Sequence, residues 1–269
     1  MVDERDFEAE QPVIKLEHVS LQYPGSSSPS VADIDLSLYE REFVCVLGPS
    51  GCGKSTLLKM LAGFERPTEG SAVFCCEPIQ SPDWRRGVVF QQPPLYPWLT
   101  VEENVAFGPK MQGIGKKERS ELAKKYLAQV GLKDFCDHKP YELSGGMRQR
   151  AAIARALINQ PKLLLMDEPF GALDALTREQ MQQLVRNIWS ETKCTFFFIT
   201  HDVDEALSLG TRVLVMSARP GRVLKEFPVT FTYGITGEKN DRTRYTQDFI
   251  SLREELLGLI SSTQENYSI

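Results

Sequence analysis

The sequence predicts an α/β fold with a mostly parallel sheet. Continuous apolar runs occur at 43–47, 163–166, 196–199 and 213–216, and such runs are typical of strands that are buried on both faces. A segment with helical spacing, 179–191, separates two of them. Because parallel strands are joined by crossovers, most often helices, this alternation predicts helices packed on a mostly parallel sheet.

The composition is that of an ordinary globular protein. The chain has 269 residues, of which 42% are hydrophobic and 25% are charged, and this excludes disorder as its main state. Its length predicts one large domain, or one domain with a small appendage. The formal net charge is −5, from 31 basic and 36 acidic residues, and this acidic balance argues against nucleic acid as a partner.

No segment of the sequence predicts export or a membrane span. The first residues are acidic and lack the apolar stretch of a secretory signal. The longest apolar runs fall far below the ~18–20 residues that a membrane-spanning helix needs. The six cysteines show no C-x-x-C spacing, so we expect free thiols in the reducing cytosol rather than a disulfide framework.

The amino-terminal part predicts a small antiparallel subdomain. Residues 1–12 are polar, and we expect them to be flexible. Apolar and polar residues alternate over 13–23 and again over 34–38, which predicts two strands, and the Pro-, Gly- and Ser-rich cluster 24–29 predicts a turn between them. The two strands should therefore form a hairpin-like pair ahead of the main sheet.

The remaining elements follow in order along the chain. Residues 88–90 predict a further buried strand, and residues 101–135, which are rich in Glu, Lys and Ala, predict a helical region. Residues 56–62 and 151–157 also have helical spacing. A docked amphipathic helix is predicted near the end, from the spacing of Phe249, Leu252, Leu256 and Ile260.

A glycine-rich loop follows the apolar strand that ends at Leu47. It fits the pattern G-x-x-x-x-G-K-[ST] and precedes a helix, which is the context of the phosphate loop in a P-loop NTPase (RecA-like) core. The glycines let backbone N–H groups surround phosphate, Lys54 can reach the β- and γ-phosphates of ATP, and the Ser55 hydroxyl can ligate Mg²⁺. The predicted nucleotide-binding residues of this loop are Gly48, Pro49, Ser50, Gly51, Cys52, Gly53, Lys54, Ser55 and Thr56.

Two carboxylates end another predicted strand. The apolar run 163–166 is followed directly by Asp167 and Glu168. Ligands of open α/β sheets bind beyond the carboxyl ends of the strands, so Asp167 is the expected Mg²⁺ partner, through water. Glu168 points to the other side of the strand and is expected to polarise the attacking water. Without the upstream phosphate loop, these acids would as readily be residues that only cap a strand.

A third motif, Leu-Ser-Gly-Gly-Met-Arg-Gln-Arg at 143–150, lies between the phosphate loop and the acidic strand end. This order of motifs resembles the ATP-binding-cassette (ABC) transporter ATPases. The resemblance covers about residues 13–225, and it implies an α-helical signature subdomain inserted at about 93–158. Residues 226–269 would then form a carboxy-terminal extension with a helix.

The resemblance implies a homodimer with shared ATP sites. Ser144, Gly145 and Gly146 begin a helix, whose N-terminus can hold phosphate, yet one chain cannot easily bring this end onto its own Lys54 site. In the family, the signature meets the γ-phosphate that the other copy holds. The active form is therefore expected to be a head-to-tail dimer with two ATP molecules in its interface.

Four further residues take roles from the resemblance. Tyr23 resembles the aromatic residue that stacks on adenine, although a tyrosine in a strand needs no such role. Gln91 resembles the glutamine that senses Mg²⁺ and water, and the Val-Phe-Gln pattern favours it over Gln92. Asp174 lies in a segment that resembles the D-loop, which crosses to the other copy. His201 resembles the switch histidine that contacts the γ-phosphate.

Within this family, two segments of the chain resemble one subfamily of importers. The segments 84–105 and 218–223 look like those of the nitrate, sulfonate and taurine importers, and the stretch after His201 is too short for the regulatory β-domain of sugar and polyamine importers. We therefore expect an ATPase at the cytoplasmic face of the cell membrane. It would drive uptake of a small anionic solute through a separate permease, with an extracytoplasmic solute-binding protein as an indirect partner. The sequence does not identify the transported solute.

Three other interpretations are compatible with parts of the sequence. An exporter ATPase would differ only in the subfamily residues. A soluble cassette of DNA repair or translation would carry a long coiled coil or a second cassette. A non-catalytic cassette would have a damaged Lys54, Glu168 or His201, and all three are present. His18 and His138 have no motif around them and receive no role.

The aromatic and proline-rich segment 92–110 predicts a binding surface. Exposed aromatic residues beside prolines often mark a groove, and in the family this surface receives a short helix of the permease. The alternative is that Trp98 is packed inside the helical subdomain, because tryptophan is usually highly buried.

Overall fold

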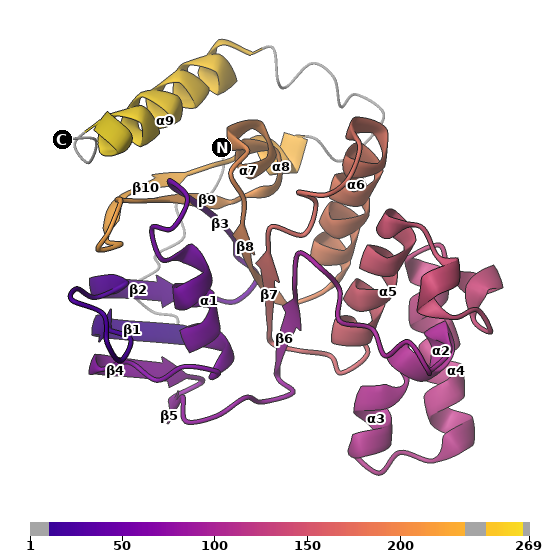
Figure 1. Ribbon diagram of the computed structural model, residues 1–269. Helices are drawn as coiled ribbons and strands as arrows, with labels where there is room; N and C mark the ends of the chain where they lie inside the picture. Colours follow the sequence, from indigo (N-terminus) through magenta and orange to yellow (C-terminus); the bar gives the residue numbers. More distant parts are fainter. Residues whose placement is uncertain (1–10, 235–245, 266–269) are drawn as a thin grey trace.

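The computed structural model describes residues 11–234 and 246–265 and shows an α/β molecule with two sheets (Figure 1). The predicted flexible segment 1–12 lies almost wholly outside the described residues. The larger sheet has six strands in the order β10-β9-β3-β8-β7-β6. These strands are β3 (Phe43–Leu47), β6 (Arg86–Val89), β7 (Leu163–Asp167), β8 (Thr195–Ile199), β9 (Arg212–Met216) and β10 (Val223–Pro228).

Parallel pairing dominates the larger sheet. Strand β3 pairs parallel with β8 and β9, β7 pairs parallel with β8, and β6 pairs parallel with β7. This pairing confirms the fold class that the continuous apolar runs predict. Strand β10 runs antiparallel to β9 at the edge. The sequence pattern does not predict β10, because three consecutive residues of this strand, Leu224, Lys225 and Glu226, are exposed.

The smaller sheet is antiparallel, with the strand order β2-β1-β4-β5. Strands β1 (Ile14–Leu21) and β2 (Val31–Leu38) are the predicted hairpin-like pair, and β4 (Glu69–Phe74) and β5 (Glu77–Pro78) extend it. The sequence pattern predicts neither β4 nor β5, since β4 exposes its first three residues and β5 has only two residues.

The helices connect these strands and gather beside the larger sheet. The predicted helical region 101–135 is divided into α2, α3 and α4, and a capping box of Thr100 and Glu103 begins the first of them. The described helices are α1 (Lys54–Ala62), α2 (Val101–Val105), α3 (Phe107–Met111), α4 (Lys116–Gln129), α5 (Gly145–Leu157), α6 (Ala175–Glu191), α7 (Val203–Leu209), α8 (Phe231–Gly234) and α9 (Gln247–Glu265).

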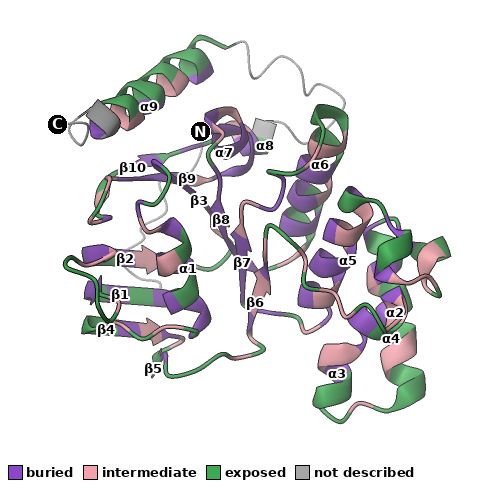
Figure 2. Cartoon of the chain, in the orientation of Figure 1, coloured by how far each residue is buried: buried purple, intermediate pink, exposed green. Residues whose placement is uncertain are grey.

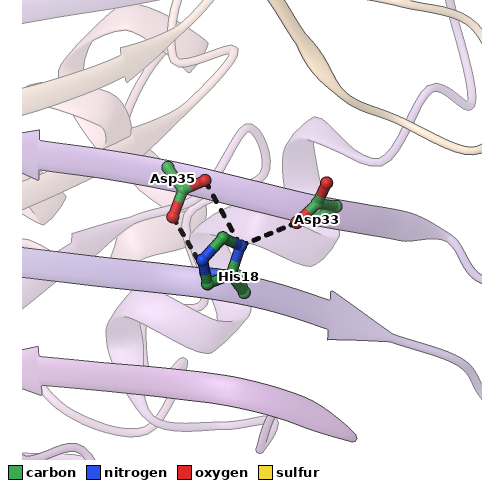
Figure 3. Close-up of side chains that lie close together, drawn as sticks. All are labelled: His18, Asp33 and Asp35. Carbon is green, nitrogen blue, oxygen red and sulfur yellow. Dashed lines mark hydrogen bonds and ion pairs between the residues drawn. The ribbon is translucent and has the colours of Figure 1, made fainter.

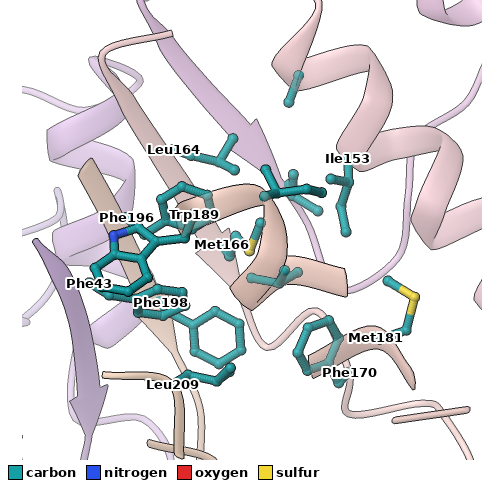
Figure 4. Close-up of a cluster of buried hydrophobic side chains, with 14 of the residues drawn as sticks. Phe43, Ile153, Leu164, Met166, Phe170, Met181, Trp189, Phe196, Phe198 and Leu209 are labelled. Atoms are coloured by element: carbon teal, nitrogen blue, oxygen red, sulfur yellow. The ribbon is translucent and has the colours of Figure 1, made fainter. Parts of the chain in front are cut away.

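The larger sheet is buried on both faces, as its central strands in Figure 2 show. Alternate residues of β3 and β8 point to opposite faces. Phe43, Phe196 and Phe198 belong to a cluster that includes Trp189 and residues of α5 and α6 (Figure 4). Phe197 belongs to the second cluster, with residues of the smaller sheet and α1. The two clusters fix the carboxyl ends of the strands, from which the functional loops start.

The carboxy-terminal helix α9 packs on α7 and β9. It buries Phe249, and Arg253 Nε donates a hydrogen bond to Asp204 of α7 at 2.7 Å. Lys225 of β10 pairs with Glu255 of α9 at 2.6 Å. Within the residues that the structure describes, none of the helices combines the length and the apolar character needed to cross a bilayer.

Candidate active site

The glycine-rich loop joins the end of β3 at Leu47 to the start of α1 at Lys54. Gly53 precedes α1 with φ 101°, and a Cβ at this position would lie 2.5 Å from Val31 of β2, so glycine is required here. The loop therefore places backbone N–H groups at a helix N-terminus, which is an arrangement that suits phosphate.

Lys54 is held inside this loop. Only 7% of the residue is exposed, and its Nζ donates hydrogen bonds to the backbone oxygens of Gly48 at 2.8 Å and Pro49 at 2.9 Å. A buried ammonium group needs such partners, because burial of an unpaired charge is costly. The Sγ of Cys52 lies 3.8 Å from the same Nζ. The loop thus concentrates one positive charge beside the N-terminus of α1, where an anion would be favoured.

A segment distant in sequence supports the phosphate loop from outside. Arg219 Nε donates a hydrogen bond to the backbone oxygen of Gly51 at 2.9 Å. Gly221 packs so closely that a Cβ on it would lie 1.9 Å from the backbone oxygen of Cys52. In the sequence, the Arg-Pro-Gly-Arg run indicates only the importer subfamily. The contact with Gly51 spans 168 positions, and no local spacing rule could reveal it.

Asp167 and Ser55 meet at the carboxyl end of β7. Ser55 Oγ donates a hydrogen bond to Asp167 Oδ1 at 3.1 Å. Burial raises the pKa of Asp167, and the hydrogen bond from Ser55 opposes this effect. A hydroxyl and a carboxylate are the hard oxygen donors that Mg²⁺ prefers. The pair therefore fits this ion, whose charge would favour the ionised carboxylate.

Glu168 turns away from the line of its strand. Its backbone is left-handed, with φ 43°, which is uncommon for a residue other than glycine and clusters at functional sites. Its Oε2 lies 3.3 Å from His201 Nδ1. A cavity of about 10 Å³, also lined by Gly171 and Thr200, lies beside the pair, and this is about the volume that one water molecule needs. The carboxylate and the imidazole can therefore flank a single water.

Gln91 approaches the turn that carries Glu168. Its Nε2 lies 3.2 Å from the position that a Cβ on Gly171 would take. The N–H of Gly171 in turn donates a hydrogen bond to the backbone oxygen of Glu168 at 3.2 Å. The structure thus brings together Gln91, Glu168 and His201, which lie on three different loops.

Ser144 and Asp174 each cap a helix. Ser144 Oγ accepts a hydrogen bond from the N–H of Met147 in α5, and Asp174 Oδ1 accepts one from the N–H of Thr177 in α6. The two helix ends are adjacent, because a Cβ on Gly146 would lie 2.7 Å from Thr177 Cγ2. Helices α5 and α1 pack on opposite faces of the larger sheet (Figure 1). One chain therefore keeps its signature apart from its phosphate loop.

Two predicted aromatic residues lie outside this centre. Tyr23 is half-buried and packs against the core cluster of the smaller sheet. Trp98 is 70% exposed, with its ring 5.4 Å from that of Tyr96. The alternative in which Trp98 is packed inside the helical subdomain is therefore wrong.

His18 belongs to an exposed cluster with Asp33 and Asp35 (Figure 3). Its Nδ1 lies 3.0 Å from Asp33 Oδ1 and 3.6 Å from Asp35 Oδ2. Because the hydrogen bond that the ring donates to Asp33 and the charges of both acids favour the protonated ring, we expect the pKa of His18 to lie above its ordinary value. The ion pair is present at low pH and is lost as the pH rises through the raised pKa. An NMR titration in which Asp33→Asn leaves this pKa unchanged would contradict the assignment.

Cys52 offers a chemical test of the phosphate loop. We expect alkylation of its thiol to block ATP binding, because the added group would enter the loop around Lys54. The residue is 1% exposed, and burial raises the pKa of its thiol, so the reaction should be slow and should accelerate at higher pH. Nucleotide binding is measured after mass spectrometry confirms the modification. Cys52→Ser treated in parallel is the control, and unchanged binding by the modified protein would refute the prediction.

These parts together define an ATPase of the P-loop class, with a phosphate loop, an acidic strand end and a water-sized cavity between a carboxylate and a histidine. Residues 31–171 match the family model described as ABC transporter. The chain belongs to this family, as an ATP-binding subunit whose ATP hydrolysis is coupled to transport.

Relatives and solved structures agree with this family. An uncharacterized ABC transporter ATP-binding protein of Methanocaldococcus jannaschii is 45% identical over 249 residues, which cover 92% of this chain and 91% of the relative. Taurine import ATP-binding protein TauB of Roseobacter denitrificans is 48% identical over 242 residues, with 90% of each chain covered.

Among solved structures, the dimeric ATP-binding cassette MJ0796, in a post-hydrolysis state bound to ADP and Pi, has a TM-score of 0.72 and 34% identity. The match covers 81% of this chain and 99% of that one. A second structure, cbiO1 from Clostridium perfringens, has a TM-score of 0.76 and 26% identity over 91% of this chain and all of that one (100%).

Proposed function

We propose that this chain is the ATP-hydrolysing subunit of an importer for a small anionic solute of the taurine, sulfonate or nitrate type. It would act as a head-to-tail homodimer on a separate permease, at the cytoplasmic face of the cell membrane. The main support for the proposal is the similarity to a protein named as a taurine import ATP-binding protein. The two sequences are 48% identical over 90% of both chains.

The hydrolytic step is assigned to Glu168 and its neighbours. The water-sized cavity beside Glu168 and His201 has room for one water next to a carboxylate that would polarise it. The buried charge of Lys54 and the imidazole of His201 would stabilise the negative charge that develops on the transferred phosphoryl group, since positioning and electrostatics dominate this chemistry. Gln91, which contacts the turn of Glu168, would help to orient the water.

Mg²⁺ would be held by Ser55 and Asp167, the latter through water, with Gln91 as a further oxygen donor. When bound, the ion neutralises phosphate charge and orients the γ-phosphate for attack by water. The hydrogen bond between the Ser55 hydroxyl and Asp167 shows that both oxygen donors reach the same place at the end of β7.

The dimer would complete each ATP site. Ser144, Gly145 and Gly146 of one copy would meet the γ-phosphate held by the other copy, and Asp174 would cross the interface beside them. The adjacency of the α5 and α6 N-termini lets both motifs face the partner from one surface. Tyr23 would stack on the adenine. The solved cassette with ADP and Pi is itself described as dimeric, which supports this arrangement.

We propose that the permease binds to the exposed surface around Trp98. Trp98 and Tyr96 form an aromatic pair beside α3, and Met111 at the end of α3 is also exposed. Exposed aromatic and sulfur-containing side chains are enriched in protein interfaces. A helix of the permease docked here would couple motion of the helical region α2–α5 to the channel. The solute-binding protein would contact only the permease.

The test is affinity purification of the tagged chain from detergent-solubilised membranes, followed by mass spectrometry. A multi-span permease in near-stoichiometric amount is expected, and Trp98→Ala should reduce its recovery about tenfold or more, as loss of a central aromatic contact does. Leu224→Ala, which removes an exposed side chain on β10, is the matched control. Active ATPase without any membrane partner would contradict the proposal. The companion binding protein can then be screened with taurine, sulfonates and nitrate.

A further inference from the structure

Glu205 is a buried carboxylic acid that the roles assigned above leave unexplained. It is the third residue of α7 and is only 5% exposed. Acidic residues are almost never buried to this degree unless they are paired. Burial raises its pKa, while hydrogen bonds from Thr200 and Gln182 oppose the rise. Keeping such a group beside the core costs stability, which points to a purpose beyond helix formation.

The hydrogen bonds of Glu205 depart from those of an ordinary capping box. In that motif the third helical residue accepts a hydrogen bond directly from the N–H of the capping residue. Here Asp202 caps α7 by accepting from the Glu205 N–H at 3.1 Å, but the N–H of Asp202 donates to Thr200 Oγ1 at 3.0 Å. Thr200 Oγ1 in turn donates to Glu205 Oε2 at 2.5 Å. A hydroxyl from the end of β8 is therefore inserted into the cap.

These hydrogen bonds hold the residues on both sides of His201. The residue lies between Thr200 and Asp202. Thr200 donates its hydroxyl to the Glu205 carboxylate, and Asp202 accepts from the Glu205 N–H and donates its own N–H to Thr200 Oγ1. The His201 side chain itself is 64% exposed, and its one ion pair among the described residues joins it to Glu168. Its orientation must therefore come largely from its backbone, and the backbone is held by Glu205.

The second carboxylate oxygen of Glu205 links this loop to α6. Glu205 Oε1 accepts a hydrogen bond from Gln182 Nε2 at 2.9 Å. Gln182 is 6% exposed and lies in α6, the helix that Asp174 caps. Glu205 and Thr200 also line the cavity beside Glu168 and His201. One buried carboxylate thus touches the cavity wall and the helix that begins at the predicted D-loop.

We infer that Glu205 is a positioning residue for hydrolysis, which acts through Thr200 to hold His201 against Glu168 and to tie this loop to α6. The inference rests on the role proposed above for His201. Loss of the Glu205 carboxylate should impair the hydrolysis step more than ATP binding, because the phosphate loop is formed between β3 and α1.

The experiment compares kcat and KM for ATP in the full chain across threonine variants. Thr200→Val keeps the shape of the side chain but removes the hydroxyl, and it should lower kcat about tenfold or more with KM within about twofold. Thr200→Ser restores the hydroxyl and should recover most of kcat. Thr195→Val is the matched control, because Thr195 is buried at the start of β8, the strand that Thr200 follows, and its hydroxyl donates to the Tyr39 backbone oxygen at 2.8 Å. The control should lose stability without losing kcat.

Two further variants separate the possible outcomes. Glu205→Gln, which can still accept from Thr200, should retain more activity than Glu205→Leu at similar stability. If His201→Ala keeps wild-type kcat, the proposed hydrolytic role of His201 fails. If His201→Ala loses activity while Thr200→Val and Glu205→Leu fall no further than Thr195→Val, the role of Glu205 alone is overturned. Loss of activity in strict proportion to the loss of unfolding free energy would also overturn it.

Discussion

Glu168→Gln is expected to bind ATP, to lose turnover and to accumulate as an ATP-dependent dimer. The amide keeps the size of the side chain and can still face His201, but it cannot accept a proton from water. Since general-base groups contribute about 10²–10⁴-fold to rate, kcat should fall by about 10²-fold or more while the Kd for ATP changes little. In the proposed dimer, ATP that is not hydrolysed would keep the two copies together, so the dimer should accumulate.

Turnover is measured by phosphate release, and the dimer by size-exclusion chromatography with and without ATP. Glu121→Gln, which changes an exposed carboxylate on α4, is the control and should behave as wild type. A Glu168→Gln variant that hydrolyses ATP at the wild-type rate would remove Glu168 from the role of base.

Gly221→Ala is expected to distort the phosphate loop, although Gly221 lies outside that loop. A Cβ at this position would lie 1.9 Å from the backbone oxygen of Cys52, so the loop, the 217–222 segment or both must move. Overpacking of this kind costs about 1–3 kcal/mol of unfolding free energy. A shift of about 1 Å in a catalytic loop can cost about 10²-fold in rate, so kcat/KM for ATP should fall to this degree.

Gly258→Ala is the control for this substitution. Gly258 lies within α9, where an added Cβ would meet nothing within 4 Å apart from its chain neighbours and the backbone of its own helix. Alanine favours a helix over glycine by about 0.5–1 kcal/mol, so this variant should be equally or more stable, with unchanged ATPase activity. Thermal unfolding measures the stability of both variants, and ATPase assays measure their activity. Wild-type kinetics for Gly221→Ala would show that the 217–222 segment does not support the loop.

The features that the sequence predicts well are those encoded by local pattern. Buried parallel strands are continuous apolar runs, so β3, β7, β8 and β9 appear in the structure where they were expected. The phosphate loop and the acidic strand end combine local spacing with the rule that ligands bind beyond the carboxyl ends of strands. Ser55 and Asp167, which are 112 positions apart, accordingly meet through a hydrogen bond.

The features that the sequence does not predict depend on partners distant along the chain. Strand β10 exposes most of its residues, and its place is set by pairing with β9 rather than by its own pattern. The support that Arg219 gives to Gly51 leaves no periodic signal in the sequence. Glu205 resembles any acidic residue in the first turn of a helix, and only its burial and its bonds to Thr200 and Gln182 distinguish it.

In the proposed dimer, two copies of this chain share each ATP site. Mixing two inactive variants tests this sharing: Lys54→Ala removes the charge of the phosphate loop, and Ser144→Arg blocks the signature. A mixed dimer contains one site in which the intact phosphate loop of one copy faces the intact signature of the other. With random pairing, and if one intact site suffices, the mixture should recover about one quarter of wild-type ATPase activity. Activity no greater than the sum of the separate variants, in a mixture where mixed dimers are demonstrated, would contradict the shared site.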